Sequence, residues 1–168
     1  MQIRRLTRQD ATAYRALRLR ALREHPQAFT SSYEEDAQVP LQVAAARLAS
    51  EAFAFWGAAE AGELYGMVGL ERDLRAKSRH KDVVIGMYVA PEAAGQGVGR
   101  ALLQALLAHA RAEGLGSLVL TVTAGNEPAL RLYEAAGFRS FGIEPDAVRV
   151  QGRSHAKNHM HLDLREAP

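Results

Sequence analysis

Three glycines at alternate positions constrain this chain more than any other feature of its sequence. Gly95, Gly97 and Gly99 follow the apolar, β-branched run 83–89 and lead into residues 98–112, where leucines recur on one side of a helix. Glycine lets the backbone approach a ligand closely, and the N–H groups of a helix's first turn attract an anion. The segment therefore predicts a strand, a turn and a helix that bind a phosphate or pyrophosphate, or else a flexible connection without a ligand.

Two other phosphate-binding motifs fit this segment less well. A P-loop ends in Gly-Lys-Ser/Thr, whereas Gly99 is followed by Arg100-Ala101. The dinucleotide fingerprint Gly-x-Gly-x-x-Gly is one residue longer, and the following strand, 118–123, lacks the acidic residue that binds a ribose. These mismatches argue against nucleotide hydrolysis and hydride transfer.

The length of 168 residues predicts a single domain over residues 1–168. No apolar run resembles a secretion signal or a membrane span, so we expect a cytoplasmic protein without a membrane partner. Because the sequence contains no cysteine, disulfides, thiolate metal sites and a cysteine nucleophile are excluded. The basic residues are dispersed along the chain, so nucleic acid is not an expected partner.

The hydrophobic pattern predicts a mixed α/β fold with one central sheet. Helices are expected over 10–24, 40–49, 98–112 and 128–136, and residues 25–40 are expected to be irregular with short helical turns. Strands are expected over 2–7, 52–60, 63–74, 83–89, 118–123, 138–143 and 157–164, and 147–150 is a further candidate.

A second segment with candidate functional residues lies between Thr123 and Phe138. Asn126 is suited to cap the helix that follows it, and Tyr133 lies seven residues later, near the same helix face. An amide and a phenol on one face can contact a single ligand. Alternatively, Tyr133 is a core aromatic residue whose hydroxyl bonds a nearby carbonyl.

Together, the two segments resemble the acetyl-CoA-binding core of the GCN5-related N-acetyltransferase (GNAT) superfamily. The resemblance rests on the glycine loop after a strand and on the pattern Asn-x6-Tyr-x3-Gly-Phe, and it covers about residues 83–142. It implies one mostly antiparallel, mixed sheet of about seven strands with four flanking helices. It also implies a bacterial N-acetyltransferase that moves an acetyl group from acetyl-CoA to a primary amine by direct attack in a ternary complex.

The resemblance further implies a role for each matched residue. The backbone around Met87 and Val89 would pair with the pantetheine amides, the amides from Gln96 to Ala101 would hold the pyrophosphate, and Tyr133 would protonate the leaving thiolate. Arg100 would reach the 3′-phosphate or the adenine. The implied cofactor-binding residues are Met87, Tyr88, Val89, Gly95, Gln96, Gly97, Val98, Gly99, Arg100, Ala101, Asn126, Ala129, Leu132 and Tyr133.

Two positions depart from the family pattern. Ala94 stands where Arg or Gln is usual, which removes one side-chain contact near the phosphates. Val83 stands where many members carry a glutamate that serves as general base. The base therefore stays open among Glu71, Asp82, His80 and water.

Two charged groups have both functional and structural interpretations. His155, His159 and His161 could supply part of a metal site, but we expect a solvated or acceptor-facing strand and no metal. The acidic run 34–36 could attract a cationic amine, although a solvated helical turn is the simpler interpretation.

The acceptor stays open among a small molecule, an amino acid or antibiotic, and a peptide amine. The alternatives to this enzyme are a CoA-binding protein without turnover and an acetyltransferase acting on protein or aminoacyl-tRNA. A second copy of the chain is a candidate partner.

Overall fold

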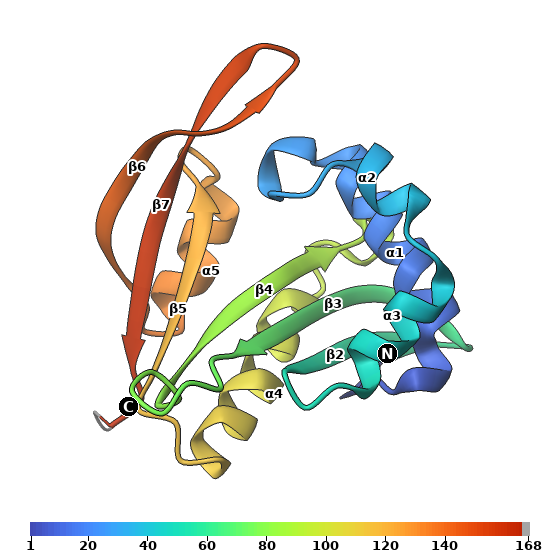
Figure 1. Cartoon of the computed structure of the whole chain (residues 1–168), viewed down its shortest axis with the longest axis horizontal. Coiled ribbons are helices and arrows are strands. Elements are labelled where there is room, and N and C mark those ends of the chain that lie inside the picture. Colours follow the sequence, from blue (N-terminus) through green and yellow to red (C-terminus); the bar gives the residue numbers. More distant parts are fainter. Residues whose placement is uncertain (166–168) are drawn as a thin grey trace.

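The computed structural model describes residues 1–165, which form a seven-stranded sheet (Figure 1). The strand order is β1-β2-β3-β4-β5-β7-β6, in which β4 and β5 are parallel and the other neighbours are antiparallel. This confirms the mixed, mostly antiparallel sheet. The strands are β1 (Gln2–Arg5), β2 (Phe53–Glu60), β3 (Glu63–Arg72), β4 (Lys81–Val89), β5 (Ser117–Thr123), β6 (Arg139–Val150) and β7 (Arg153–Asp163).

The described residues contain five α-helices, one more than the four expected. They are α1 (Ala11–Glu24), α2 (Tyr33–Gln38), α3 (Leu41–Ala49), α4 (Val98–Ala112) and α5 (Glu127–Ala135). The additional helix is α2, whose six residues are too few to give a clear helical period in the sequence. Its start is fixed by a capping box, in which Ser32 and Glu35 each accept a hydrogen bond from the other's backbone N–H. No helix within residues 1–165 is long and apolar enough to cross a membrane.

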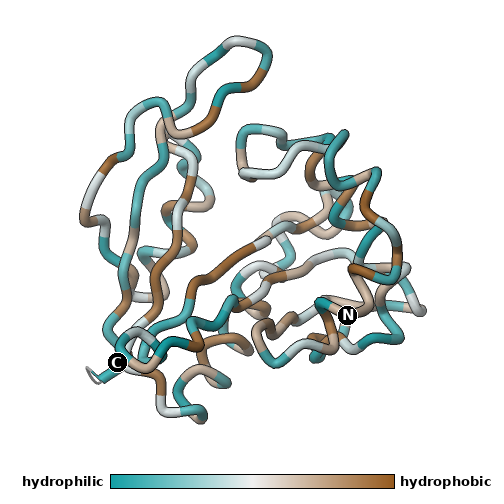
Figure 2. The backbone as a smooth tube through the Cα atoms, viewed as in Figure 1, coloured by the Kyte–Doolittle hydropathy of each residue, from teal (hydrophilic) through white to brown (hydrophobic). Residues whose placement is uncertain are grey.

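The helices cover the two faces of the sheet and build two hydrophobic cores. On one face, α4 and α5 pack on the sheet through buried residues that include Leu102, Leu106 and Tyr133. On the other face, α1 and α3 pack on Phe55 and Met67. Hydrophobic stretches run along β4 and β5 in the middle of the molecule (Figure 2).

The C-terminal hairpin is longer than the sequence pattern predicts. The expected strands over 138–143 and 147–150 form one strand, β6, with two register shifts in its pairing with β7. The second shift contains Pro145 and Asp146, and Asp146 has a φ of 50°. These residues interrupt the alternation that predicts a strand, but they form a bulge and do not end the strand.

Strand β4 contains an irregularity beside the opening in the sheet. Gly86 has a φ of 63°, and the pairing with β3 shifts at this point. One extra residue in a strand reverses the faces of all residues after it. Ile85 therefore faces the α1 side, and Met87 faces the α4 side. β4 pairs with β5 over Lys81–Val83 and Ser117–Val119, and beyond this point the two strands diverge in a V (Figure 1).

Candidate active site

A cavity of about 420 Å³ lies where β4 and β5 diverge. Its walls come from α1, α3, α5, the segment 28–31 and the strands β2 to β5. Val122 and Tyr133 belong to the core under α4 and α5, whereas Phe55 belongs to the core under α1 and α3. The cavity thus connects the two faces of the sheet, so that a donor from one side can meet an acceptor from the other.

The edge of β4 offers backbone hydrogen-bond groups to this opening. Ala90 N donates to Tyr65 O on β3 at 2.8 Å. Successive N–H groups of a strand point to opposite edges, so the N–H groups of Val89 and Met87 point away from β3 and toward the divergence. An extended ligand can add to such an edge as a further strand.

The glycine loop forms an open cradle at the start of α4. Gly95 and Gly97 have φ values of 75° and 76°, and a Cβ atom at either position would meet nothing within 4 Å. Ala101 N donates to Gly97 O at 3.0 Å and is therefore already used within the helix. The N–H groups before it lack intrahelical partners, as in any first turn. This arrangement fits an anionic group held by backbone N–H groups from Gln96 to Arg100.

Helix α5 brings an amide and a phenol to the cavity. The Asn126 side chain accepts a hydrogen bond from Ala129 N at 3.3 Å and caps the helix, as expected. The Tyr133 side chain packs edge-on against Phe138, and its hydroxyl has no hydrogen-bond partner among residues 1–165. Burial raises the pKa of Tyr133, so its hydroxyl keeps its proton. The alternative of a core tyrosine bonded to a carbonyl is therefore not what the structure shows.

Two other matched residues lie beside the loop rather than in the cavity. Leu132 faces Gly99 across the start of α4, where a Cβ atom on the glycine would lie 3.5 Å from the leucine. Arg100 and Leu132 line a second hollow of about 320 Å³ between α4 and α5. The buried side chain of Val98 belongs to the core.

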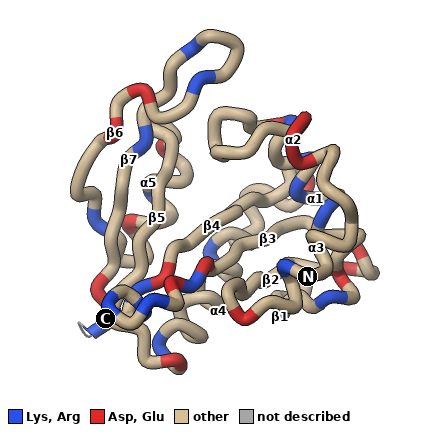
Figure 3. Tube along the Cα trace, in the orientation of Figure 1, with Lys and Arg blue, Asp and Glu red and all other residues tan. Residues whose placement is uncertain are grey.

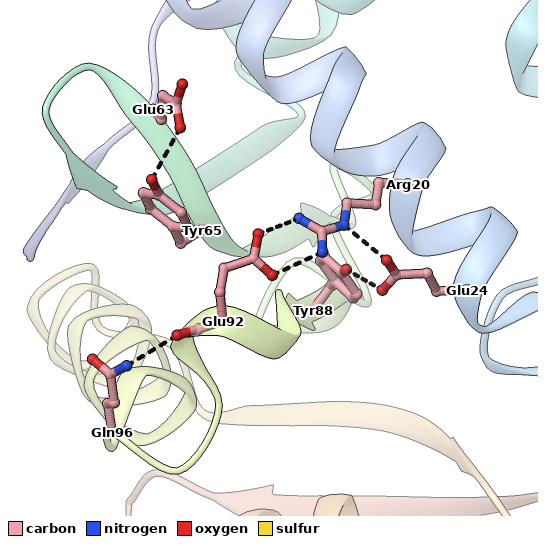
Figure 4. Close-up of polar contacts among 7 residues, drawn as sticks. All are labelled: Arg20, Glu24, Glu63, Tyr65, Tyr88, Glu92 and Gln96. Carbon is pink, nitrogen blue, oxygen red and sulfur yellow. Dashed lines mark hydrogen bonds and ion pairs between the residues drawn. The ribbon is translucent and has the colours of Figure 1, made fainter.

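A polar network fixes the position of the segment before the loop (Figure 4). Tyr88 Oη donates to Glu24 Oε2 at 2.5 Å, and Arg20 on α1 bonds both Glu24 and Glu92. Arg20 lowers the pKa of Glu92 to about 2. The Gln96 side chain donates to Glu92 O at 3.0 Å. The Tyr88 side chain thus lies away from the cavity, so only its backbone remains near the predicted ligand.

The three candidate bases have different surroundings. Glu71 on β3 lines the cavity. Asp82 is 2% exposed under α4, where burial raises its pKa and Arg72 Nε lies 3.9 Å from its carboxylate. His80 is exposed before β4, and its carbonyl accepts hydrogen bonds from Gly116 and Ser117. Neither of these two lines the cavity, which leaves Glu71 as the one candidate in place.

Sequence reasoning missed two arginines at the end of the cavity opposite α5. Arg18 on α1 forms an ion pair with Asp36 at 2.6 Å. The guanidinium of Arg47 on α3 lies 4.5 Å from the ring centre of Phe53 and 5.3 Å from that of Phe55. No sequence signal separates these residues from the other arginines, and the basic residues, Lys and Arg together, are scattered along the trace (Figure 3). Only the packing of α1 and α3 brings them together.

The other charged groups mostly serve the structure. Within the acidic run, Glu35 caps α2 and Asp36 pairs with Arg18. His159 Nε2 lies 2.7 Å from Glu144 Oε2, an acidic neighbour that the sequence did not reveal. The part of the chain that the structure describes contains no group of three or more side chains placed to hold a metal ion.

Comparisons with known proteins agree with this geometry. A model described as the Acetyltransferase (GNAT) family matches residues 19–138. A mycothiol acetyltransferase from Thermobispora bispora is 34% identical over 139 residues, which make up 80% of this chain and 45% of that protein. The chain thus spans less than half the length of this curated relative.

Two solved structures superpose on nearly the whole chain. An acetyltransferase of the GNAT family from Streptococcus pneumoniae has a TM-score of 0.87 at 22% identity, covering 96% of this chain and 98% of that one. A putative acetyltransferase (yncA) from Salmonella typhimurium, solved with its cofactor acetyl-CoA, has a TM-score of 0.85 at 25% identity. This match covers 100% of this chain and 96% of that one.

Proposed function

The chain belongs to the GNAT acetyltransferase family, and from this premise we propose that it is an N-acetyltransferase that transfers an acetyl group from acetyl-CoA directly to a primary amine. The observation that carries the proposal is the cavity between β4 and β5, which connects the two faces of the sheet. The edge of β4 borders it on one side and Tyr133 on the other. Donor and acceptor can therefore enter from opposite faces and meet between these groups.

The donor is proposed to lie along β4 and across the start of α4. The N–H groups from Gln96 to Arg100 hold the pyrophosphate, because they lack intrahelical partners and open glycines surround them. The backbone of Met87 and Val89 and the Asn126 side chain hold the pantetheine arm, and Ala129 and Leu132 pack on it. Arg100 faces the hollow between α4 and α5 and suits the 3′-phosphate or the adenine.

Acetyl-CoA supplies the acetyl group as a thioester, and the side chains and backbone of the chain position and polarise the reaction. The N–H of Val89 donates to the carbonyl oxygen and stabilises the charge that develops there. Tyr133 gives its proton to the leaving sulfur, a role that fits a buried hydroxyl without another partner. Glu71 is the proposed base, because it alone of the three carboxylate and imidazole candidates lines the cavity.

The proposal is tested by measuring thiol release from acetyl-CoA with a panel of primary amines. The chain has no cysteine, so a thiol reagent detects only free CoA. We expect at least one amine to raise CoA release above the hydrolysis rate, and the rate to increase with pH until the amine is mostly neutral. No release with any amine while CoA still binds would instead indicate a binding protein without turnover.

Replacing Tyr133 tests the general acid. We expect Tyr133→Phe to lower kcat by roughly 10- to 1,000-fold, while the affinity for acetyl-CoA stays within a few-fold. The control is Tyr65→Phe, which removes a phenol that bonds Glu63 outside the cavity. An unchanged kcat in the Tyr133 variant would mean that solvent protonates the sulfur and that Tyr133 only packs.

A further inference from the structure

Arg47 carries a positive charge into the cavity without a partner for it. Its Nε is buried and has no hydrogen-bond partner, and within residues 1–165 no carboxylate lies within ion-pair distance of its guanidinium. The rings of Phe53 and Phe55 hold the guanidinium in place, at 4.5 and 5.3 Å from their centres. A buried donor without an acceptor is costly, so this group is suited to receive an acceptor from a ligand.

Glu71 lines the same cavity as Arg47 without pairing with it. Phe53, which packs under the guanidinium, is the direct cross-strand neighbour of Glu71. Both charged residues line the same cavity, and Glu71 forms no ion pair within 4.0 Å with any described residue. The cavity thus contains an unpaired cation and an unpaired anion, and Phe53 lies beside both of them.

The surrounding groups strengthen the positive end. Asp36 neutralises Arg18, so Arg18 adds no free charge there. The Tyr14 hydroxyl, on a side chain that is 2% exposed, also has no hydrogen-bond partner among the described residues. Tyr14 lines a smaller hollow of about 160 Å³ that shares Arg18 and Arg47 with the cavity. Arg47 Nε is thus an unpartnered donor in the wall of the cavity itself, and the Tyr14 hydroxyl is one beside the smaller hollow.

We propose that the acceptor is an α-amino acid or a close analogue, with its carboxylate on Arg47 and its amino group beside Glu71. The proposal rests on the acetyltransferase function proposed above and specifies its substrate class. A guanidinium binds a carboxylate through paired, charge-assisted hydrogen bonds. An amino acid places a cation and an anion a few bonds apart, which matches the unpaired charges of this cavity.

The reaction balances with these groups. The ammonium gives one proton to Glu71, which passes it to solvent. The neutral nitrogen then forms a C–N bond to the acetyl carbon, and the C–S bond breaks as Tyr133 protonates the sulfur. The second nitrogen proton leaves through Glu71 to solvent, and solvent reprotonates Tyr133. Each turnover yields an N-acetyl amino acid, free CoA and one released proton.

Other acceptor classes fit these charges less well. A polyamine would bring additional positive charge next to Arg47. An N-terminal peptide amine lacks the α-carboxylate that Arg47 would bind. The acidic run that could have attracted a polyamine is used in a helix cap and an ion pair.

The experiment compares L-amino acids with the amines that remain when their carboxylate is removed, such as L-leucine with isoamylamine. For the wild-type protein we expect kcat/KM to be at least about ten times higher for the amino acid of a pair. Arg47→Met keeps the apolar stem on the phenylalanine rings and removes the charge. We expect it to lower kcat/KM for the amino acid by about 10- to 100-fold, mainly through KM, and for the amine by less than about 3-fold.

Two further variants separate charge recognition from folding. Arg8→Met removes one exposed arginine outside the cavity and should leave the preference for the amino acid unchanged. Arg47→Lys keeps the charge and should retain part of the preference. Thermal unfolding of each variant shows whether it is folded.

The failure of this proposal can be distinguished from the failure of the acetyltransferase function. Two results would overturn the amino acid proposal alone. One is an equal kcat/KM of the wild-type protein for an amine and its amino acid, and the other is an Arg47→Met variant that lowers kcat/KM equally for both members of a pair. If no compound releases CoA, calorimetric titration of L-leucine and isoamylamine into the CoA-saturated protein decides. Tighter binding of L-leucine to wild type than to Arg47→Met supports the subsite, and equal binding overturns it.

Discussion

At the scale of single residues, side chains of the same type differ in whether their polar atoms already have hydrogen-bond or ion-pair partners. Tyr65 and Tyr88 each bond a glutamate, whereas the Tyr133 hydroxyl is unpartnered within the described residues. Arg20 holds two carboxylates, whereas Arg47 holds none. A buried polar group without a partner is costly, and Arg47 Nε is such a group in the wall of the cavity between β4 and β5. Residue type alone does not separate these side chains, whereas the state of their hydrogen bonds does.

A prediction at this scale concerns Gly97. In Gly97→Glu a carboxylate would enter the proposed phosphate cradle and repel the pyrophosphate, so we expect the Kd for acetyl-CoA to rise by about 100-fold or more in calorimetric titrations. The left-handed conformation at this position also disfavours any side chain, at a cost of roughly 1–2 kcal/mol in folding. A control must therefore carry the same strain.

Gly114 supplies that control at the other end of α4. Its φ of 73° is close to the 76° of Gly97, and a Cβ atom there also meets nothing within 4 Å. We expect Gly114→Glu to lose similar stability and to keep the Kd within about 3-fold. Equal affinities of the two variants would show that the glycine loop does not hold the phosphates.

At the scale of elements, the sequence predicted the regular segments better than the irregular ones. The helix over 98–112 is observed with the expected bounds, because glycines border a clear leucine period. The bulge at Gly86 was not expected, although an isolated glycine within a strand is its usual signal. The sequence predicted two strands in place of β6, because Pro145 and Asp146 interrupt the alternation of apolar and polar residues. Bulges depend on the pairing partner, which the local sequence does not contain.

The edge of β4 leads to a prediction about hydrogen exchange. In the free protein, the amides of Tyr88 and Ala90 pair with β3 and should exchange slowly, whereas those of Met87 and Val89 point to the divergence and should exchange faster. Saturating CoA should slow Met87 and Val89 by about tenfold or more and change Tyr88 and Ala90 much less. The measurement is amide exchange by NMR, residue by residue.

Each outcome of this experiment has a definite meaning. Residues of the two pairs alternate along one segment of four residues, so each pair is the control of the other. Uniform protection of all four amides on CoA binding would indicate general stabilisation. In that case β4 would not pair with the cofactor, and the proposed polarising role of Val89 would be lost.

At the scale of the whole molecule, the site depends on residues that are distant in sequence. Arg47 on α3 and Tyr133 on α5 line one cavity although they come from opposite faces of the sheet. The elements of the proposed donor side could be predicted, because the glycine loop and the Asn126–Tyr133 helix are local patterns. Glu71 was one of several candidates on the proposed acceptor side, and Arg18 and Arg47 could not be predicted there, because only the packing of α1 and α3 on the sheet brings them to the cavity.

A polar contact joins the two sides at the open end of the divergence. Lys157 on β7 is 5% exposed, and its Nζ donates to Gln27 O at 3.1 Å and to Thr123 Oγ1 at 3.2 Å. Thr123 Oγ1 in turn donates to Gln27 O at 2.9 Å. Burial lowers the pKa of Lys157, and the Glu144 carboxylate opposes this shift. The contact holds the segment 26–31, which forms part of the cavity wall, against β5 and β7.

This contact gives the last prediction, Lys157→Met. Replacing a buried charge by an apolar side chain of similar volume is often neutral for stability, so we expect Tm to change by only about 3 °C or less. The wall segment, however, loses its anchor. Amide exchange at Ala28 and Phe29 should accelerate, and KM for the amine acceptor should rise by about 3- to 10-fold, while the Kd for acetyl-CoA stays within about 2-fold.

Lys81→Met is the matched control, because Lys81 lies at the closed end of the divergence, where β4 pairs with β5. It removes the same charge and should leave both the exchange at 28–29 and the acceptor KM unchanged. A large loss of Tm in Lys157→Met would mean that the lysine mainly supports the fold. Unchanged exchange and KM would mean that the segment 26–31 is held by its packing, and that the acceptor side of the cavity does not depend on this contact.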